Sequence, residues 1–175
     1  MDAVDQFILL RHARAGRKIR DRAKDFRRRL DRKGEQVALS LPELITSYLL
    51  PELVVSSPFR RCVQTVEPLA DGLGVHVVED DRFTPGRSRT AVRKAFSDVA
   101  ANSIICTHGE VIARLFDEPV SCAKGAFWIV ERRGDKFIPS RYVEAPKPTL
   151  NRVLSAGHGG SSAITQSHSD EEEAR

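Results

Sequence analysis

Short apolar runs alternate along this chain with longer stretches in which apolar residues recur at helical spacing. Continuous apolar runs are typical of strands buried on both faces of a sheet. They predict strands at residues 7–10, 53–56, 75–78 and 103–106. The helical spacing predicts helices at residues 35–50, 57–73, 89–99 and 110–116, the first with Pro42 as a point where it can kink.

The pattern changes near the C-terminal end of the last predicted helix. Two apolar segments, 126–131 and 136–143, flank Arg-Arg-Gly-Asp at residues 132–135, which predicts a β-hairpin. Strands that alternate with helices are typical of parallel sheets, because helical crossovers cover both faces. We therefore expect an α/β fold of three layers, α/β/α, with a mainly parallel sheet and an antiparallel edge.

Hydrophobic periodicity stops soon after the hairpin. Residues 151–169 are rich in Ser, Gly and Ala, and residues 170–173 form an acidic run. Such a composition does not supply enough apolar surface for a packed core. A chain of 175 residues corresponds to a single domain. The expected organisation is one domain over residues 1–145, followed by a disordered Ser/Gly-rich acidic tail over residues 146–175.

Composition narrows the class of protein. With 41% hydrophobic and 30% charged residues the chain is typical of globular proteins, and no apolar run is long enough to cross a membrane or form a signal peptide. We expect a cytoplasmic protein with no membrane partner. Three widely spaced cysteines, Cys62, Cys106 and Cys122, suggest neither a disulfide framework nor a zinc site, and are expected to be buried structural thiols.

The net charge of +4 hides a strong asymmetry. Residues 11–33 contain twelve Lys or Arg against three Asp, a formal charge of +9, so the rest of the chain is acidic. A local positive field favours phosphate-bearing ligands, nucleic acid or an acidic surface, although a solvated arm has the same composition. Phe26 is the single aromatic residue of this stretch. Nucleic acid is an unlikely partner, because single-strand binders use aromatic stacking.

Candidate chemistry lies where the predicted strands end. His12 and His108 each follow a buried strand, and Arg11 precedes the first of them. Arg60 and Arg61 lie near the start of the helix after residue 56. Ligands of open α/β sheets bind at the carboxyl ends of the strands, so these groups are expected to share one crevice suited to a phosphoryl group. Each feature alone is more often an ordinary surface turn or a solvated helix face.

Three motifs in this order resemble the histidine phosphatase superfamily, whose fold is phosphoglycerate-mutase-like. They are Leu-Leu-Arg-His-Ala at residues 9–13, Ser-Ser-Pro-Phe-Arg-Arg-Cys-Val-Gln-Thr at residues 56–65 and Ile-Cys-Thr-His-Gly-Glu at residues 105–110. Ala13 in the first motif is similar to the small phosphohistidine-phosphatase branch. The second motif and residues 124–128 also resemble the phosphatase domain fused to some actinobacterial Nudix hydrolases.

The resemblance implies a mechanism and a set of site residues. His12 would be the nucleophile that carries a covalent phosphohistidine. Arg11, Arg61 and His108 would surround the phosphoryl oxygens, with Arg14 as a further phosphate-binding residue, and Arg61 rather than Arg60 would take this role. Neither a metal nor another cofactor is implied.

A proton donor for the leaving group is harder to assign. The family often places an acid after the third strand, and the local candidates are Glu79, Asp80 and Asp81, although the usual position falls on Thr84 or Pro85. These three carboxylates also suit a solvated turn. Weak acid assistance penalises alkyl phosphates most, which favours substrates with better leaving groups, such as phosphohistidine or a nucleoside diphosphate.

Two functions of different classes follow. The leading hypothesis is a metal-independent phosphatase acting on a phosphorylated small molecule, a nucleotide or a phosphohistidine protein. Residues 17–33 would then cover the mouth of the pocket and attract the anionic substrate. The alternative is a catalytically weak module that binds a phosphorylated partner or nucleic acid. A mutase is disfavoured, because the chain is short and no acid is evident.

Overall fold

A six-stranded sheet with the order β3-β2-β4-β1-β5-β6 runs through the protein. In this computed structural model, which describes residues 5–147, the strands are β1 (Gln6–Arg11), β2 (Leu53–Ser56), β3 (Val77–Glu79), β4 (Ser103–Thr107), β5 (Phe127–Arg133) and β6 (Lys136–Val143). The first four strands of the order pair in parallel, and β5 and β6 add an antiparallel hairpin beside β1. The predicted parallel sheet with an antiparallel edge is confirmed.

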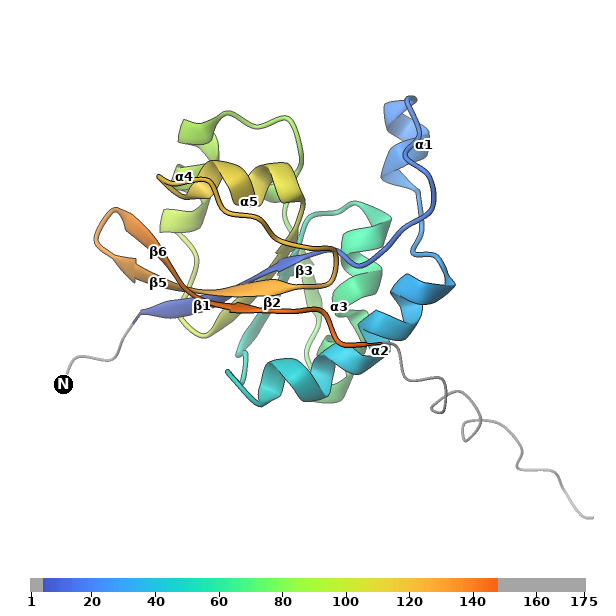
Figure 1. Cartoon of the computed structure of the whole chain (residues 1–175), viewed down its shortest axis with the longest axis horizontal. Coiled ribbons are helices and arrows are strands. Elements are labelled where there is room, and N and C mark those ends of the chain that lie inside the picture. Colours follow the sequence, from blue (N-terminus) through green and yellow to red (C-terminus); the bar gives the residue numbers. More distant parts are fainter. Residues whose placement is uncertain (1–4, 148–175) are drawn as a thin grey trace, which may run out of the picture.

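Helices cover both faces of the sheet (Figure 1). One face packs against the pair α2 (Arg32–Thr46) and α3 (Arg60–Leu73), and the other against α4 (Arg89–Ser97) and α5 (Gly109–Leu115). Side chains alternate between these two cores along each strand; Ile8 and Leu10 of β1 face α2 and α3, whereas Phe7 and Leu9 face the other layer. The predicted three-layer α/β/α architecture is thereby confirmed.

Local capping explains where the helices depart from the predicted boundaries. Helix α2 begins before residue 35 because the Asp31 carboxylate accepts a hydrogen bond from the Gly34 N–H (2.9 Å), and it continues through Pro42. Helix α3 begins at Arg60, after an extended Phe59. It ends at Gly74, whose φ of 68° is the left-handed conformation that glycine adopts at little cost.

The basic segment between β1 and α2 forms a separate arm. It contains the short helix α1 (Arg22–Phe26), which extends away from the sheet (Figure 1). The arm returns to its own base, where Ala15 and Leu30 form an isolated bridge and the Asp31 N–H donates to the Arg14 carbonyl (3.1 Å). The predicted long loop with a helical turn matches this segment.

The region after β3 contains the short 3₁₀ helix η1 (Asp81–Phe83), which leads into α4. No helix among residues 5–147 is long and apolar enough to cross a membrane. Residues 148–175, which make up nearly all of the predicted tail, lie outside the described residues. The division into a domain and a disordered tail therefore stays a prediction.

Candidate active site

Two histidines lie side by side at the carboxyl ends of the central strands. The parallel register of β1 and β4 places Arg11 opposite Thr107, so the residues that follow, His12 and His108, leave the sheet together. The His12 N–H donates to the Thr107 carbonyl (3.0 Å), and the two ring centroids are 5.3 Å apart. Both side chains are buried. The structure thus brings together the two histidines that the sequence placed in one crevice.

Arg61 joins these histidines from the first turn of α3. Its Nε donates to His12 Nε2, and its second terminal nitrogen lies against His108 Nδ1, each at 3.3 Å. Arg60 points elsewhere and pairs with Glu67 (2.9 Å). The structure therefore separates the two adjacent arginines in the way that the motif implied, with Arg61 at the centre of the site.

Asp25 is a central residue that the sequence analysis missed. Its carboxylate pairs with Arg61 (3.2 Å) and with Arg28 (2.7 Å), and its backbone carbonyl accepts a second bond from Arg61 (2.9 Å). Burial alone would raise the pKa of Asp25, but hydrogen bonds from Arg28 and the Ile19 N–H and the charge of Arg61 lower it. An acidic residue inside a basic run was the available signal.

His12 is held in one tautomer with an unprotonated Nε2. Its Nδ1 lies 2.8 Å from the Ala13 carbonyl, which only accepts, so Nδ1 carries the proton and Nε2 keeps its lone pair. Burial and the charges of Arg61 and Arg11 lower the pKa of His12 to about 3, against the opposing effect of the Ala13 hydrogen bond. The imidazole is therefore neutral near pH 7, with Nε2 directed toward Arg61.

His108 has the opposite tautomer. Its Nδ1 accepts from Arg61, so Nε2 carries the proton and donates to the Ser57 hydroxyl (2.9 Å). Burial, His12 and Arg61 lower its pKa to about 2. Ser57 in turn is positioned by the sheet, since its N–H donates to the Cys106 carbonyl (2.9 Å). In the absence of an anion this second histidine is therefore a neutral group.

Arg11 lines the same site with an unused donor. One terminal nitrogen donates to the Cys122 carbonyl (2.7 Å), whereas the buried Nε has no hydrogen-bond partner within residues 5–147. A Cβ at Gly109 would lie 2.9 Å from the guanidinium carbon, so the glycine leaves room for this side chain. A buried N–H without an acceptor is costly, and a phosphoryl oxygen would satisfy it.

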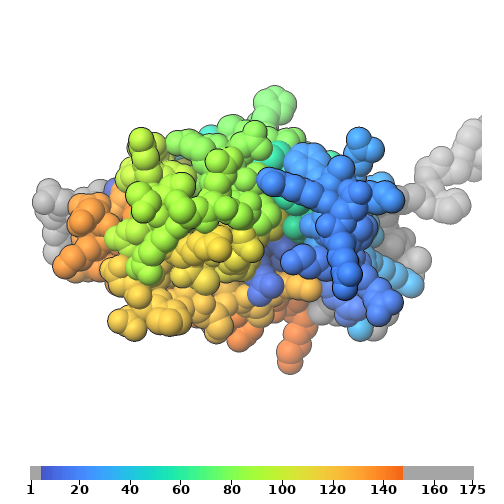
Figure 2. Space-filling view, turned by 90° about the horizontal axis from the view of Figure 1, so that it is seen from above, coloured from blue at the N-terminus to red at the C-terminus, as the bar shows by residue number. Residues whose placement is uncertain are grey.

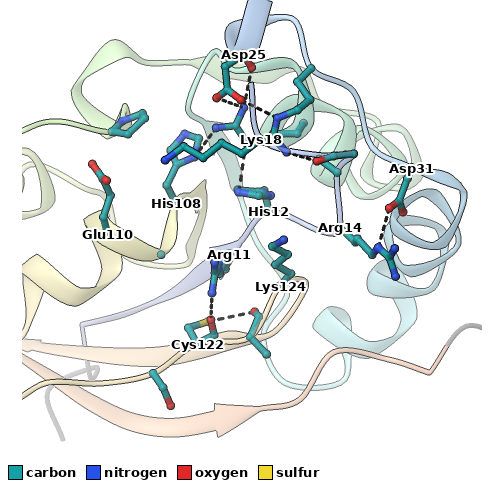
Figure 3. A pocket seen from close by; sticks show the side chains of 18 of the residues that line it. Arg11, His12, Arg14, Lys18, Asp25, Asp31, His108, Glu110, Cys122 and Lys124 are labelled. Atoms are coloured by element: carbon teal, nitrogen blue, oxygen red, sulfur yellow. Dashed lines mark hydrogen bonds and ion pairs between the residues drawn. The ribbon is translucent and has the colours of Figure 1, made fainter. Parts of the chain in front are cut away.

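These groups open into a cavity of about 1090 Å³. Its walls come from the basic arm, from the start of α5 and from the segment before β5. Figure 2 shows the blue N-terminal arm on one side of this face and the green and yellow segments on the other. Arg14 lines the cavity too, but its guanidinium pairs with Asp31 (2.7 Å), as Figure 3 also shows.

Residues 7–84 match the sequence model of the histidine phosphatase superfamily (branch 1), a range that includes the first two motifs, and His108 completes the site. Over these residues the chain is similar to the histidine phosphatase superfamily. The resemblance expected from the motifs is thereby confirmed.

Relatives of known name support the same assignment. An 8-oxo-(d)GTP phosphatase of Mycolicibacterium smegmatis is 27% identical over 155 residues, which are 79% of this chain and 48% of that protein. The chain thus spans about half the length of this curated relative. The histidine phosphatase fold recurs in the protein histidine phosphatase SixA complexed with tungstate, with a TM-score of 0.66, 21% identity and coverage of 79% of this chain and 96% of that one. A mycobacterial glucosyl-3-phosphoglycerate phosphatase complexed with VO3 has a TM-score of 0.61, 16% identity and coverage of 81% and 100%.

The cavity is not lined by the predicted proton donors Glu79, Asp80 and Asp81. Asp80 caps η1 and pairs with Arg82 (2.7 Å), which lowers its pKa through hydrogen bonding. Glu79 borders a different, smaller groove. Their positions therefore do not support the prediction that one of these three residues protonates the leaving group.

Three other carboxylates line the cavity: Asp25, Asp31 and Glu110. Each is engaged by an arginine, and Glu110 pairs with Arg114 (3.3 Å) and accepts from the Gly86 N–H. For Asp25 the hydrogen bond from Arg28 and the charge of Arg61 lower the pKa, so this carboxylate is not arranged to supply a proton. Within residues 5–147 no group of three or more His, Cys, Asp or Glu side chains is arranged to hold a metal ion.

Proposed function

We propose that this chain is a phosphatase that transfers a phosphoryl group to Nε2 of His12 and then to water. The observation that carries the proposal is the tautomer of His12, since the Ala13 carbonyl binds Nδ1–H and leaves Nε2 unprotonated, with its lone pair on the side of Arg61. Its low pKa keeps that lone pair available at neutral pH. A buried, neutral imidazole between guanidinium groups is suited to attack an anionic phosphorus.

In the first step Nε2 forms a bond to phosphorus while the bond to the leaving group breaks, and the leaving group takes the electron pair. The Nδ1 proton stays on the imidazole. Water then attacks phosphorus while the Nε2–P bond breaks and its electron pair returns to Nε2; the water proton passes to phosphate or solvent, inorganic phosphate leaves, and His12 is neutral again. Arg61 and Arg11 move no proton; their donors, which now contact ring nitrogens and a carbonyl, would turn to the phosphoryl oxygens.

His108 would serve the same oxygens. A dianionic phosphate next to its ring would raise the pKa of His108 from its low value, because opposite charges favour the charged form. The protonated ring would then donate from Nδ1 to phosphate while keeping its bond to Ser57. The positive charge needed in the transition state would thus be created by the substrate itself.

Phosphorylated small molecules, nucleotides and phosphohistidine proteins are the proposed substrate classes. Paired carboxylates in the cavity favour leaving groups that depart without a proton. The names of the relatives, an 8-oxo-(d)GTP phosphatase and a protein histidine phosphatase, are consistent with two of these classes. A cytoplasmic setting is also proposed, supported by the free thiols of Cys62, Cys106 and Cys122.

The decisive experiment traps the phosphoenzyme. Wild type and His12→Ala are mixed with p-nitrophenyl phosphate in the presence of a chelator, and each reaction is stopped in alkali and in acid. We expect an acid-labile, alkali-stable phosphate on wild type alone, and turnover at least about 10³-fold lower in the variant. Absence of such a phosphoenzyme with every substrate class above would refute the proposal, and tight phosphate binding without turnover would instead support a binding module.

A further inference from the structure

We propose that Arg17, Lys18 and Lys124 form a second anion site in the cavity, which binds the leaving phosphate of a phosphoanhydride such as a nucleoside diphosphate. We call these three residues the distal cations. The inference rests on the proposed function, because the first phosphate is the one transferred to His12. It selects one substrate class from those that the reaction chemistry allows.

The distal cations are the cavity-lining cations that the protein itself leaves unused. Seven Lys or Arg residues and three Asp or Glu residues line the cavity. Arg14 pairs with Asp31, Arg28 and Arg61 share Asp25, and Arg11 bonds to a carbonyl. Within residues 5–147, no hydrogen bond or ion pair holds the charged groups of the distal cations.

The distal cations come from two segments that are distant along the chain, and they line the same cavity as His12. Arg17 and Lys18 belong to the basic arm, and Lys124 precedes β5. In Figure 3 the side chains of Lys18 and Lys124 point into the cavity on either side of His12. Several like charges held around one space repel one another and attract a polyanion. The cavity of about 1090 Å³ is also far larger than a single phosphate requires.

Leaving-group chemistry distinguishes a phosphoanhydride from a phosphohistidine protein. When the terminal phosphoryl group of a nucleoside diphosphate moves to His12, the leaving group is the nucleoside monophosphate. Its phosphate gains negative charge as the bond breaks. Nearby ammonium groups stabilise this charge without donating a proton, which suits a cavity whose carboxylates are all paired. A phosphohistidine releases a neutral imidazole, which gains nothing from these cations. The charge pattern therefore favours the phosphoanhydride.

The first test compares two substrates in the same variants. We would measure kcat/KM for a nucleoside diphosphate and for p-nitrophenyl phosphate in wild type, Lys18→Gln, Lys124→Gln and the double variant. We expect the ratio of the two values to fall about tenfold per lysine, equivalent to about 1.4 kcal/mol, and less at high salt. Lys24→Gln is the matched control, because Lys24 lies on the same arm outside the cavity lining. Lys18→Arg should restore most of the ratio.

The second test needs no turnover. In His12→Ala, calorimetry would compare binding of a nucleoside diphosphate with binding of inorganic phosphate. We expect the lysine substitutions to weaken the diphosphate selectively, and equal weakening of both ligands would overturn the second site. A wild type that hydrolyses a phosphohistidine peptide faster than the diphosphate would overturn the substrate class. If no substrate yields a phosphoenzyme but selective diphosphate binding persists, the proposed phosphatase activity is refuted. The proposal of a second anion site would still stand.

Discussion

The Asp25 carboxylate lies 3.2 Å from a terminal nitrogen of Arg61, and this ion pair connects the basic arm to the phosphate-binding centre. Both side chains are nearly inaccessible to solvent. Asp25 also holds Arg28, whose guanidinium binds the Gly16 carbonyl (2.7 Å). The arm is therefore fastened to the site by its own acidic residue, so a change in the arm is transmitted to the guanidinium that faces both histidines.

Asp25→Asn should weaken both activity and stability. The amide keeps the shape of the side chain but leaves Arg61 without its counter-charge, so we expect kcat/KM for p-nitrophenyl phosphate to fall about ten- to hundredfold. The free energy of unfolding should drop by about 1–3 kcal/mol in urea titrations. Asp21→Asn is the control, because the exposed Asp21 only caps α1 and asparagine caps as well. Equal effects of the two substitutions would contradict the role of the ion pair.

Gly109→Ala should impair catalysis with little loss of fold. The added Cβ would lie 2.9 Å from the guanidinium carbon of Arg11, and the flexible arginine would give way before the sheet does. We expect kcat/KM to fall about tenfold or more, with a melting temperature close to that of wild type. Gly72→Ala, where a Cβ meets nothing within 4 Å, should leave kcat/KM at the wild-type value. Full activity in Gly109→Ala would show that Arg11 is not needed in this position.

The buried histidines should make stability fall on the acid side of pH 6.5. His12 and His108 bind protons in the unfolded chain near pH 6.5 but in the folded protein only near pH 3 and pH 2. The unfolded state therefore binds more protons as the pH falls from 6.5 to about 3, and each histidine then lowers the free energy of unfolding by up to about 1.4 kcal/mol per pH unit.

Urea titrations between pH 7 and pH 4 would measure this slope. His12→Ala should reduce it, and substitution of the exposed His76 by alanine is the matched control. A slope that is the same in wild type and His12→Ala would mean that His12 binds its proton as readily in the folded protein as in the unfolded chain. That result would also remove the main support for its role as nucleophile.

Ser57→Ala should act on the second histidine alone. The hydroxyl accepts from His108 Nε2 at 2.9 Å, so its removal leaves that ring free to turn. We expect kcat to fall about tenfold while the phosphoenzyme still forms on His12, and Ser57→Thr should recover part of the loss. Rapid-quench measurement of phosphoenzyme formation would separate this effect from loss of the nucleophile. Ser47→Ala, at the exposed end of α2, is a suitable control.

Local pattern was sufficient to predict most of the fold. The apolar runs that became β1, β2 and β4 are unambiguous because a strand buried on both faces excludes polar residues. Boundaries set by capping were predicted less well, since the start of α2 depends on a single carboxylate, Asp31. The acid after the third strand was the weakest prediction. Carboxylates are abundant in turns, and composition does not say which of them face a cavity.

The sequence by itself determined the layers and the two histidines at strand ends, because hydrophobic period is a local property, and the choice of Arg61 came from the resemblance of its motif to a known family. Tertiary structure alone decided the partners of the charges. Asp25 and Arg28 are close neighbours on the arm, but Arg61 lies 36 residues beyond Asp25, and only the folded arm brings this arginine into the same ion-pair group. Because the carboxylates that line the cavity are taken by arginines, no ion pair within residues 5–147 holds Lys18 or Lys124, and their charges stay available to a ligand.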